Sequence, residues 1–187
     1  MIRRATRDDA AGIARIHVSV WRDAYADFIP ADFLASLSER RRVSFWNQQL
    51  TENKHLTFVA FDGGEMVGWA SGGPSRDADA TGESEVYAIY VARAHWRRGV
   101  GRGLMTALED ALPGGRAVGL WVLRLNMPAV RFYETLGYAR VGGEKEINIG
   151  GATLTGIRLK KNRANPHEPA PTPAPSGIPA GPEPRRD

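Results

Sequence analysis

The strongest constraint on the fold is one stretch near the middle of the chain, EVYAIYVARAHWRRGVGRGLMTALE, residues 85–109. Its first part is rich in β-forming residues and its last part has the apolar spacing of a helix, with three glycines between them. The first N–H groups of a helix have no partner inside the helix and carry partial positive charge. Glycines let an anion approach the backbone, and arginines add charge. The stretch therefore predicts a phosphate-binding loop. The alternative is a turn that only lets the helix pack on the sheet.

The spacing of the glycines excludes two common phosphate loops. No Gly-Lys-Ser/Thr follows, as a Walker A loop requires, and Leu104 stands where a dinucleotide fingerprint needs its last glycine. The pattern present is R-x-x-G-x-G, carried by Arg98, Gly101 and Gly103. It resembles the pyrophosphate-binding motif of the GCN5-related N-acetyltransferase (GNAT) family, in which this loop holds the diphosphate of acetyl-coenzyme A.

A second motif, NMPAVRFYETLGY at residues 126–138, resembles the N-x(5)-F-Y-x-x-x-G-F/Y signature of the same family. Asn126 is also a good helix N-cap, and Pro128 suits the first turn. The resemblance implies that Asn126 contacts the pantetheine arm and that Tyr133 protonates the leaving thiolate. The alternative is that Phe132 and Tyr133 are only the buried face of a helix.

Hydrophobic periodicity predicts helices at about 8–25, after Pro30, from Ser38 to about 49, at 101–112 and from 126 to 136. Strands are predicted at 2–5, 56–61, 66–70, 86–91, 118–123, 138–147 and 153–160, and a polar loop at 72–83. This order is the GNAT order. The resemblance implies an α/β (α+β) fold with a mixed, mostly antiparallel sheet, helices on both faces, and a parallel strand pair that splays apart.

The family resemblance also assigns the cofactor site. Backbone groups of Ile89, Tyr90 and Val91 would pair with pantetheine, with the Ile89 N–H as oxyanion donor. The remaining cofactor contacts implied by the resemblance are Arg97, Arg98, Gly99, Val100, Gly101, Arg102, Gly103, Leu104, Asn126 and Phe132.

The acceptor amine must lose a proton before it attacks, since an alkylammonium has a pKa near 10.4. Glu85 is the first candidate for this base and Tyr87 the second, and either could instead be a surface residue of the strand. Trp21 and Tyr25 are expected to line the acceptor site, with core packing as the alternative. Asp77 and Asp79, in the 72–83 loop, would attract a cation.

Composition limits the remaining possibilities. The chain of 187 residues has no cysteine and no long apolar run, so we expect a cytoplasmic protein without disulfides, metal site or membrane association. The net charge of +4 permits nucleic-acid binding, but the arginines are mostly scattered, so no nucleic acid is expected. Residues 1–160 are predicted to form the domain. Residues 161–187, with eight of the 12 prolines, are predicted to form a disordered tail.

These features favour an acetyl-CoA-dependent N-acetyltransferase acting on a primary amine of a small molecule by direct attack in a ternary complex. A protein N-terminus or lysine is the second candidate acceptor. A non-catalytic acyl-CoA sensor and, more weakly, a nucleic-acid-binding protein are the rivals. Many members of this family are dimers, so a homodimer stays open.

Overall fold

The computed structural model describes residues 1–163. Five α-helices occur in this range: α1 (Ala10–Ala24), α2 (Ala31–Ser36), α3 (Glu39–Glu52), α4 (Val100–Ala111) and α5 (Met127–Glu134). Three short 3₁₀ turns accompany them: η1 (Arg7–Asp9), η2 (Ala78–Ala80) and η3 (Arg93–His95). The strands are β1 (Ile2–Arg4), β2 (Leu56–Asp62), β3 (Glu65–Pro74), β4 (Ser84–Val91), β5 (Ala117–Leu123), β6 (Ala139–Ile149) and β7 (Ala152–Asn162).

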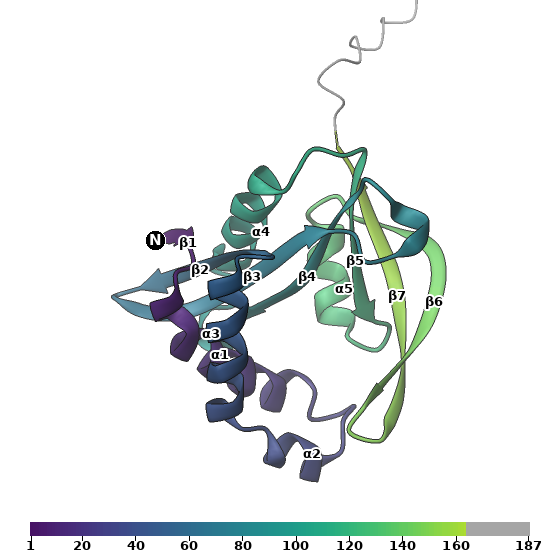
Figure 1. Cartoon of the computed structure of the whole chain (residues 1–187). Helices are drawn as coiled ribbons and strands as arrows, with labels where there is room; N and C mark the ends of the chain where they lie inside the picture. The colour runs from purple at the N-terminus through teal and green to yellow at the C-terminus, as the bar shows by residue number, and fades with distance from the viewer. Residues whose placement is uncertain (164–187) are drawn as a thin grey trace, which may run out of the picture.

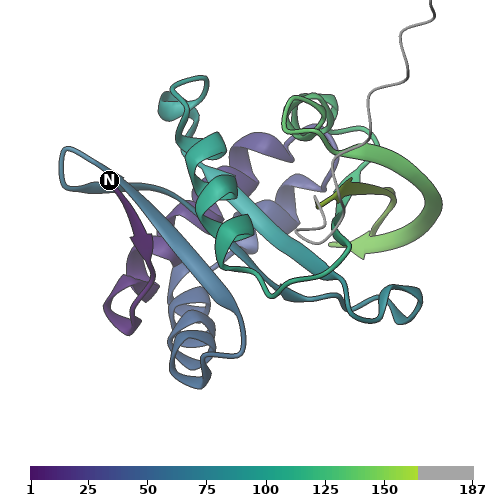
Figure 2. The same ribbon diagram turned by 90° about the horizontal axis from the view of Figure 1, so that it is seen from above.

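The seven strands form one sheet in the order β1-β2-β3-β4-β5-β7-β6. Every neighbouring pair is antiparallel except β4 and β5, which are parallel. The long β6–β7 hairpin curves away from the other strands (Figures 1 and 2). The predicted fold class, a mixed and mostly antiparallel sheet with one parallel pair, is therefore confirmed.

Helices cover both faces of the sheet. Figure 1 shows α4 on one side and α1, α2 and α3 on the other. The first face packs Leu104, Met105 and Leu108 of α4 onto alternate residues of β4, β5 and β7, and α5 joins this core through Val130 and Tyr133. On the second face, α1 and α3 pack onto Trp69. Two separate apolar cores thus hold the sheet between them, because burying apolar surface is the main stabilising term.

The predicted helix starts follow from local hydrogen bonds. The Ser38 hydroxyl accepts from the Arg41 N–H at 3.4 Å at the start of α3, and the Asn126 side chain accepts from the Ala129 N–H at 3.2 Å at the start of α5. These side chains satisfy donors that a helix leaves without an internal partner. At the N-terminus, Thr6 does not cap α1 directly. Its N–H donates to the Asp9 carboxylate at 2.7 Å across η1.

The prediction of a polar loop at residues 72–83 is wrong at its N-terminal boundary. β3 runs to Pro74, and Gly72 and Gly73 pair with Val86 and Glu85 of β4. The glycines were misleading because they suggest a turn. Here Gly72 lies so close to β4 that an added Cβ would be 2.6 Å from the Glu85 carbonyl oxygen. At the other end, β7 reaches Asn162, two residues past the predicted domain boundary. The predicted tail from 164 onward lies outside the described residues.

Replacing Gly72 by alanine should destabilise the protein by about 2 kcal/mol, since the new methyl group meets backbone that cannot move aside. Gly114→Ala is the matched control, because nothing lies within 4 Å of the Cβ it would add. Urea unfolding of the two variants measures the difference. Equal free energies of unfolding would contradict the close packing at Gly72.

Candidate active site

The central feature of the site is the gap between β4 and β5. The two strands pair only through Ser84, Glu85 and Val86 of β4 with Val118, Gly119 and Leu120 of β5. β4 nevertheless continues to Val91 and β5 to Leu123. Backbone groups of β4 beyond the paired part therefore face the gap without a strand partner among residues 1–163.

A β-bulge in β4 decides which groups face this gap. Gly72 pairs with Val86 and Ser71 with Ala88, so Tyr87 is the extra residue. Ala92 donates its N–H to the Val67 carbonyl at 2.8 Å. Because hydrogen bonds alternate along an antiparallel ladder, Tyr90 also directs its backbone groups to β3, and Ile89 and Val91 direct theirs into the gap.

This alternation separates the three residues predicted to bind pantetheine. Ile89 and Val91 have backbone groups on the gap side, and Tyr90 does not. The Val91 carbonyl accepts from the indole N–H of Trp96 at 2.7 Å. A ligand that uses this carbonyl would either share it with the Trp96 indole or displace that side chain, which is 42% exposed.

The glycine-rich loop leads directly into α4. Gly99 is the N-cap with φ of 81°, and Arg97 also has positive φ, at 59°. The first helical hydrogen bond runs from the Gly103 N–H to the Gly99 carbonyl at 2.9 Å. The N–H groups from Gly99 to Arg102 thus precede the helical ladder at a helix N-terminus, a position that favours anions.

Three arginines surround these N–H groups. Arg97, Arg98 and Arg102 are exposed, and none has a carboxylate within salt-bridge distance in the described part of the chain. Unpaired cations at a helix N-terminus favour an anionic ligand.

Two of the predicted loop residues serve packing. An added Cβ on Gly103 would lie 2.6 Å from Ile2 Cδ1, and one on Gly101 would lie 3.1 Å from Phe132 Cζ. The Leu104 side chain is fully buried in the α4 core, and its N–H belongs to the helical ladder. The structure therefore gives Leu104 no group that faces the loop. Phe132 joins α5 to the start of α4 beside the glycine-rich loop.

Tyr133 brings a phenol from α5 toward the gap. Its side chain is buried, and among the described residues its hydroxyl has no hydrogen-bond partner. Burial raises the pKa of Tyr133 well above its ordinary value of 10, and the nearby Tyr25 hydroxyl raises it further. Tyr133 therefore stays protonated across the physiological pH range and can donate a proton.

An aromatic cluster covers the other side of the gap, on the α1 face of the sheet. Its members are His17, Trp21, Tyr25, Trp69 and Tyr90. The Trp21 indole donates to the Tyr90 hydroxyl at 2.9 Å, and the rings of Trp21 and Tyr25 pack edge to face. Burial raises the pKa of Tyr90, and the Tyr25 and Tyr133 hydroxyls contribute to that shift. Three phenols, from the residue that follows α1, from β4 and from α5, thus approach one another.

Glu85, the first candidate for the base, is 2% exposed and is not a surface residue. Its carboxylate accepts the Arg76 backbone N–H at 2.9 Å and is also paired with the Arg76 guanidinium. Tyr87 donates its hydroxyl to the Pro74 carbonyl at 2.7 Å. Both candidates are held in place by β3 and the segment that follows it.

The two aspartates of the loop are already paired. Asp79 pairs with Arg158 at 2.7 Å, and Asp77 accepts from the Trp121 indole at 2.8 Å and lies 3.2 Å from Arg158. These partners come from β5 and β7 and were not found in the sequence, because only the strand register brings them beside the loop. The carboxylates therefore anchor the loop, and their charge toward a ligand is largely balanced.

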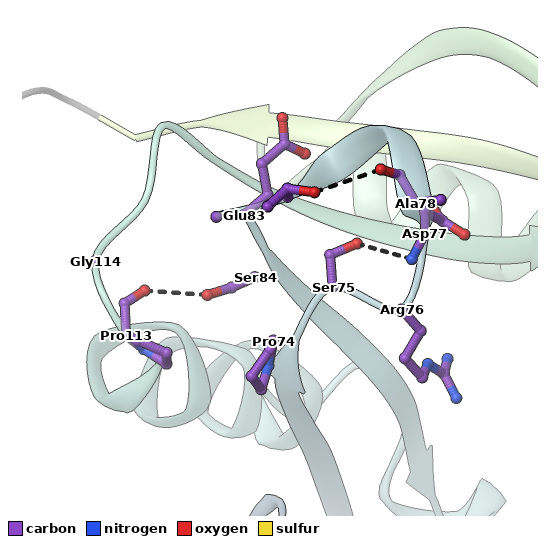
Figure 3. A pocket seen from close by; sticks show the side chains of 11 residues that line it. Pro74, Ser75, Arg76, Asp77, Ala78, Glu83, Ser84, Pro113 and Gly114 are labelled. Atoms are coloured by element: carbon purple, nitrogen blue, oxygen red, sulfur yellow. Dashed lines mark hydrogen bonds between the residues drawn. The ribbon is translucent and has the colours of Figure 1, made fainter.

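A hollow of about 490 Å³ lies where this loop meets the end of α4, lined by Pro74, Ser84, Pro113 and their neighbours. Ser84 donates to the Pro113 carbonyl at 3.0 Å, and Figure 3 shows Arg76 extending away from Pro113 and Gly114. Since Ser84 belongs to the paired end of β4, this hollow is at the opposite end of α4 from the arginines. The hollow is therefore separate from the glycine-rich loop.

Comparison with known proteins agrees with this geometry. Residues 18–138 match the family described as "Acetyltransferase (GNAT) family". The chain is 31% identical over 174 residues to the uncharacterized N-acetyltransferase YuaI of Bacillus subtilis (strain 168), covering 87% of this chain and 98% of YuaI. The chain therefore belongs to the GNAT acetyltransferase family.

Solved structures share the fold. One is yncA from Salmonella typhimurium with its cofactor acetyl-CoA, at a TM-score of 0.67 and 20% identity, covering 92% of this chain and 98% of that one. Another is PaiA N-acetyltransferase from Thermoplasma acidophilum in complex with coenzyme A, at 0.62 and 16%, covering 87% and 98%.

None of the helices within residues 1–163 has the length and apolar character needed to cross a membrane.

The buried His17 gives the site a measurable acid sensitivity. Burial lowers the pKa of His17 to about 3, and the Arg42 charge contributes. The pKa of His17 in the folded protein is below its value near 6.5 in the unfolded chain. The contribution of the neutral imidazole to the free energy of unfolding is therefore complete above pH 6.5 and is lost as the pH falls toward 3. The free energy of unfolding should then fall by roughly 1.4 kcal/mol per pH unit from this group. His17→Phe should show a shallower decline in urea unfolding between pH 7 and pH 4. Identical slopes in both proteins would contradict the lowered pKa of His17.

Proposed function

We propose that this GNAT acetyltransferase uses acetyl-CoA to acetylate a primary amine of a small molecule, by direct attack in a ternary complex. One observation carries the proposal: the β4 edge at Ile89 and Val91, which has no strand partner within residues 1–163, leads through η3 to a helix N-terminus with three arginines that have no carboxylate partner in that range. An extended amide-containing arm that ends in a diphosphate fits these two features together. Acetyl-CoA would supply the activated acyl group.

The residues around the gap would divide the remaining work. The Ile89 and Val91 backbone would hold the pantetheine arm like an added strand, and Arg97, Arg98 and Arg102 would hold the diphosphate. The Ile89 N–H would donate to the thioester oxygen. Tyr133 would protonate the leaving thiolate, and Glu85 would take up the amine proton through water.

The acceptor would bind on the α1 side of the gap, which is called the acceptor face below. Two elements beside this face, α2 and the β6–β7 turn, contact each other, and this contact favours a small acceptor. Phe33 of α2 packs against Gly150 in the β6–β7 turn so closely that a Cβ on Gly150 would collide with its ring. The two elements also lie near each other in Figure 1. A protein N-terminus or lysine, the second candidate acceptor, would have to enter past this contact.

Removing the Arg98 side chain should weaken acetyl-CoA binding about 10- to 150-fold, since a charge-assisted phosphate contact is worth about 1.5–3 kcal/mol. Isothermal titration measures the affinity. Arg7→Ala, which removes an exposed arginine in η1, should bind like the unaltered protein. No binding of acetyl-CoA by the unaltered protein would overturn the proposed function.

Tyr133→Phe should lower kcat about 100-fold with little change in acetyl-CoA affinity, because it removes the acid and keeps the ring. Tyr138→Phe is the control. Tyr138 is also buried, but its hydroxyl donates to Glu109 at 2.9 Å, on the α4 side. Thiol release with a panel of amines gives the rates. Binding without release in the unaltered protein, on any amine, would favour the sensor instead.

A further inference from the structure

Among residues 1–163, one cation on the part of the acceptor face formed by β5, β7 and β6 and the segment after β3 has no carboxylate partner. Arg76 is paired with Glu85, and Arg158 is paired with Asp77 and Asp79. The third cation is Lys145 of β6. Its ammonium lies 3.9 Å from the centroid of the Trp121 ring, and no carboxylate of residues 1–163 is within salt-bridge distance of it.

Strand register places Lys145 on the same face as the proposed base. Lys145 pairs with Gly156, and Trp121 pairs with Arg158, so all four residues point to one side of the β5–β7–β6 sheet. It is the side opposite to Leu120 and Val122, which pack toward α4. Glu85 of β4 likewise faces away from Val86, which belongs to the same core.

The Trp121 ring fixes where the ammonium stands along the gap. Trp121 follows Leu120, the last residue of β5 that pairs with β4, so it lies where the two strands begin to separate. Its indole N–H donates to Asp77 at 2.8 Å, which holds the ring in place. Lys145 is thus held at the inner end of the gap, on the acceptor side.

Arg76 offers a second set of donors on this face, because its partner Glu85 pairs with Gly119, two residues before Trp121. Its Nε and Nη2 bind Glu85, and its Nη1 has no acceptor in the described part of the chain. The Arg76 side chain is 59% exposed, and its guanidinium lies 4.2 Å from the Tyr87 ring centroid. Burial lowers the pKa of Lys145, whereas the charges of Asp77 and Glu85 raise it and the smaller effects of Arg76 and Arg158 lower it. An anion bound to the Lys145 ammonium would stabilise its charged form against this burial.

We propose that Lys145, with the free Nη1 edge of Arg76, binds a carboxylate of the acceptor, so that the acceptors of this enzyme are free amino acids. The inference rests on the proposed function and names its substrate class. Lys145 would make the direct contact and set specificity. A neighbouring Glu85 is compatible with the anion because Arg76 already neutralises it.

The test compares L-amino acids with their carboxamides, which keep the size of the acceptor and remove its charge. The two amines differ in basicity, so the quantity measured is the acid-to-amide ratio of kcat/KM in each variant. Lys145→Met should lower this ratio about fivefold or more, through the KM of the acid, as expected for a partly desolvated ion pair. Lys145→Arg should restore most of it. Lys54→Met, which removes an exposed lysine paired with Glu52, should keep the original ratio.

A binding measurement makes the result independent of turnover. N-acetyl amino acids, titrated into the complex with coenzyme A, should bind more tightly than their N-acetyl amides, and Lys145→Met should abolish the difference. Unchanged ratios in Lys145→Met would overturn the carboxylate site. A lower KM for all amines in Lys145→Met would also overturn the carboxylate site, since the acceptor ammonium would then bind on the Trp121 ring. Loss of acetyl-CoA binding or of transfer to every amine would instead refute the proposed function.

Discussion

The separation of β4 from β5 after three paired residues is the constraint on which the rest of the site depends. A parallel pair normally satisfies backbone groups along its whole length, and unpaired backbone groups are costly when water cannot reach them. Here the Tyr87 bulge turns the strand, and the groups beyond it face a gap. The Trp96 indole satisfies the Val91 carbonyl, which shows how the protein itself can partner this edge.

The gap also divides the chemistry between two sides of the sheet. α4 and α5 supply the arginines, the free N–H groups and Tyr133, which suit an anionic and extended ligand. The other side supplies the aromatic cluster around His17 and the balanced charges around Trp121. Tyr133 reaches from the first side toward the Tyr25 and Tyr90 hydroxyls of the second. A transfer reaction needs two ligands to meet in this way, in line and with water largely excluded.

Much of the fold was predictable because it depends on local signals. The β2–β3 hairpin, the Ser38 and Asn126 caps and the glycine-rich start of α4 are each encoded within a few residues. The site was predictable only in part. Arg98 and Tyr133 lie in motifs, whereas Arg76, Trp121, Arg158 and Lys145 acquire their neighbours from strand register, which a single sequence does not reveal. Gly72 shows the opposite error. Its residue type suggested a loop, and close packing against Glu85 of β4 decides its position instead.

The extra residue at Tyr87 changes which face of the sheet each later side chain of β4 occupies. Side chains of a strand alternate between faces with a period of two, so Glu85 and Tyr90, an odd number of residues apart, would ordinarily point to opposite sides. The bulge puts both on the α1 face, and it keeps Val86, Ile89 and Val91 together on the other. Deleting one residue here would exchange the two faces for the whole second half of β4. The strand therefore tolerates changes of side chain far more readily than a change of length, and its count of residues is itself part of the design of the site.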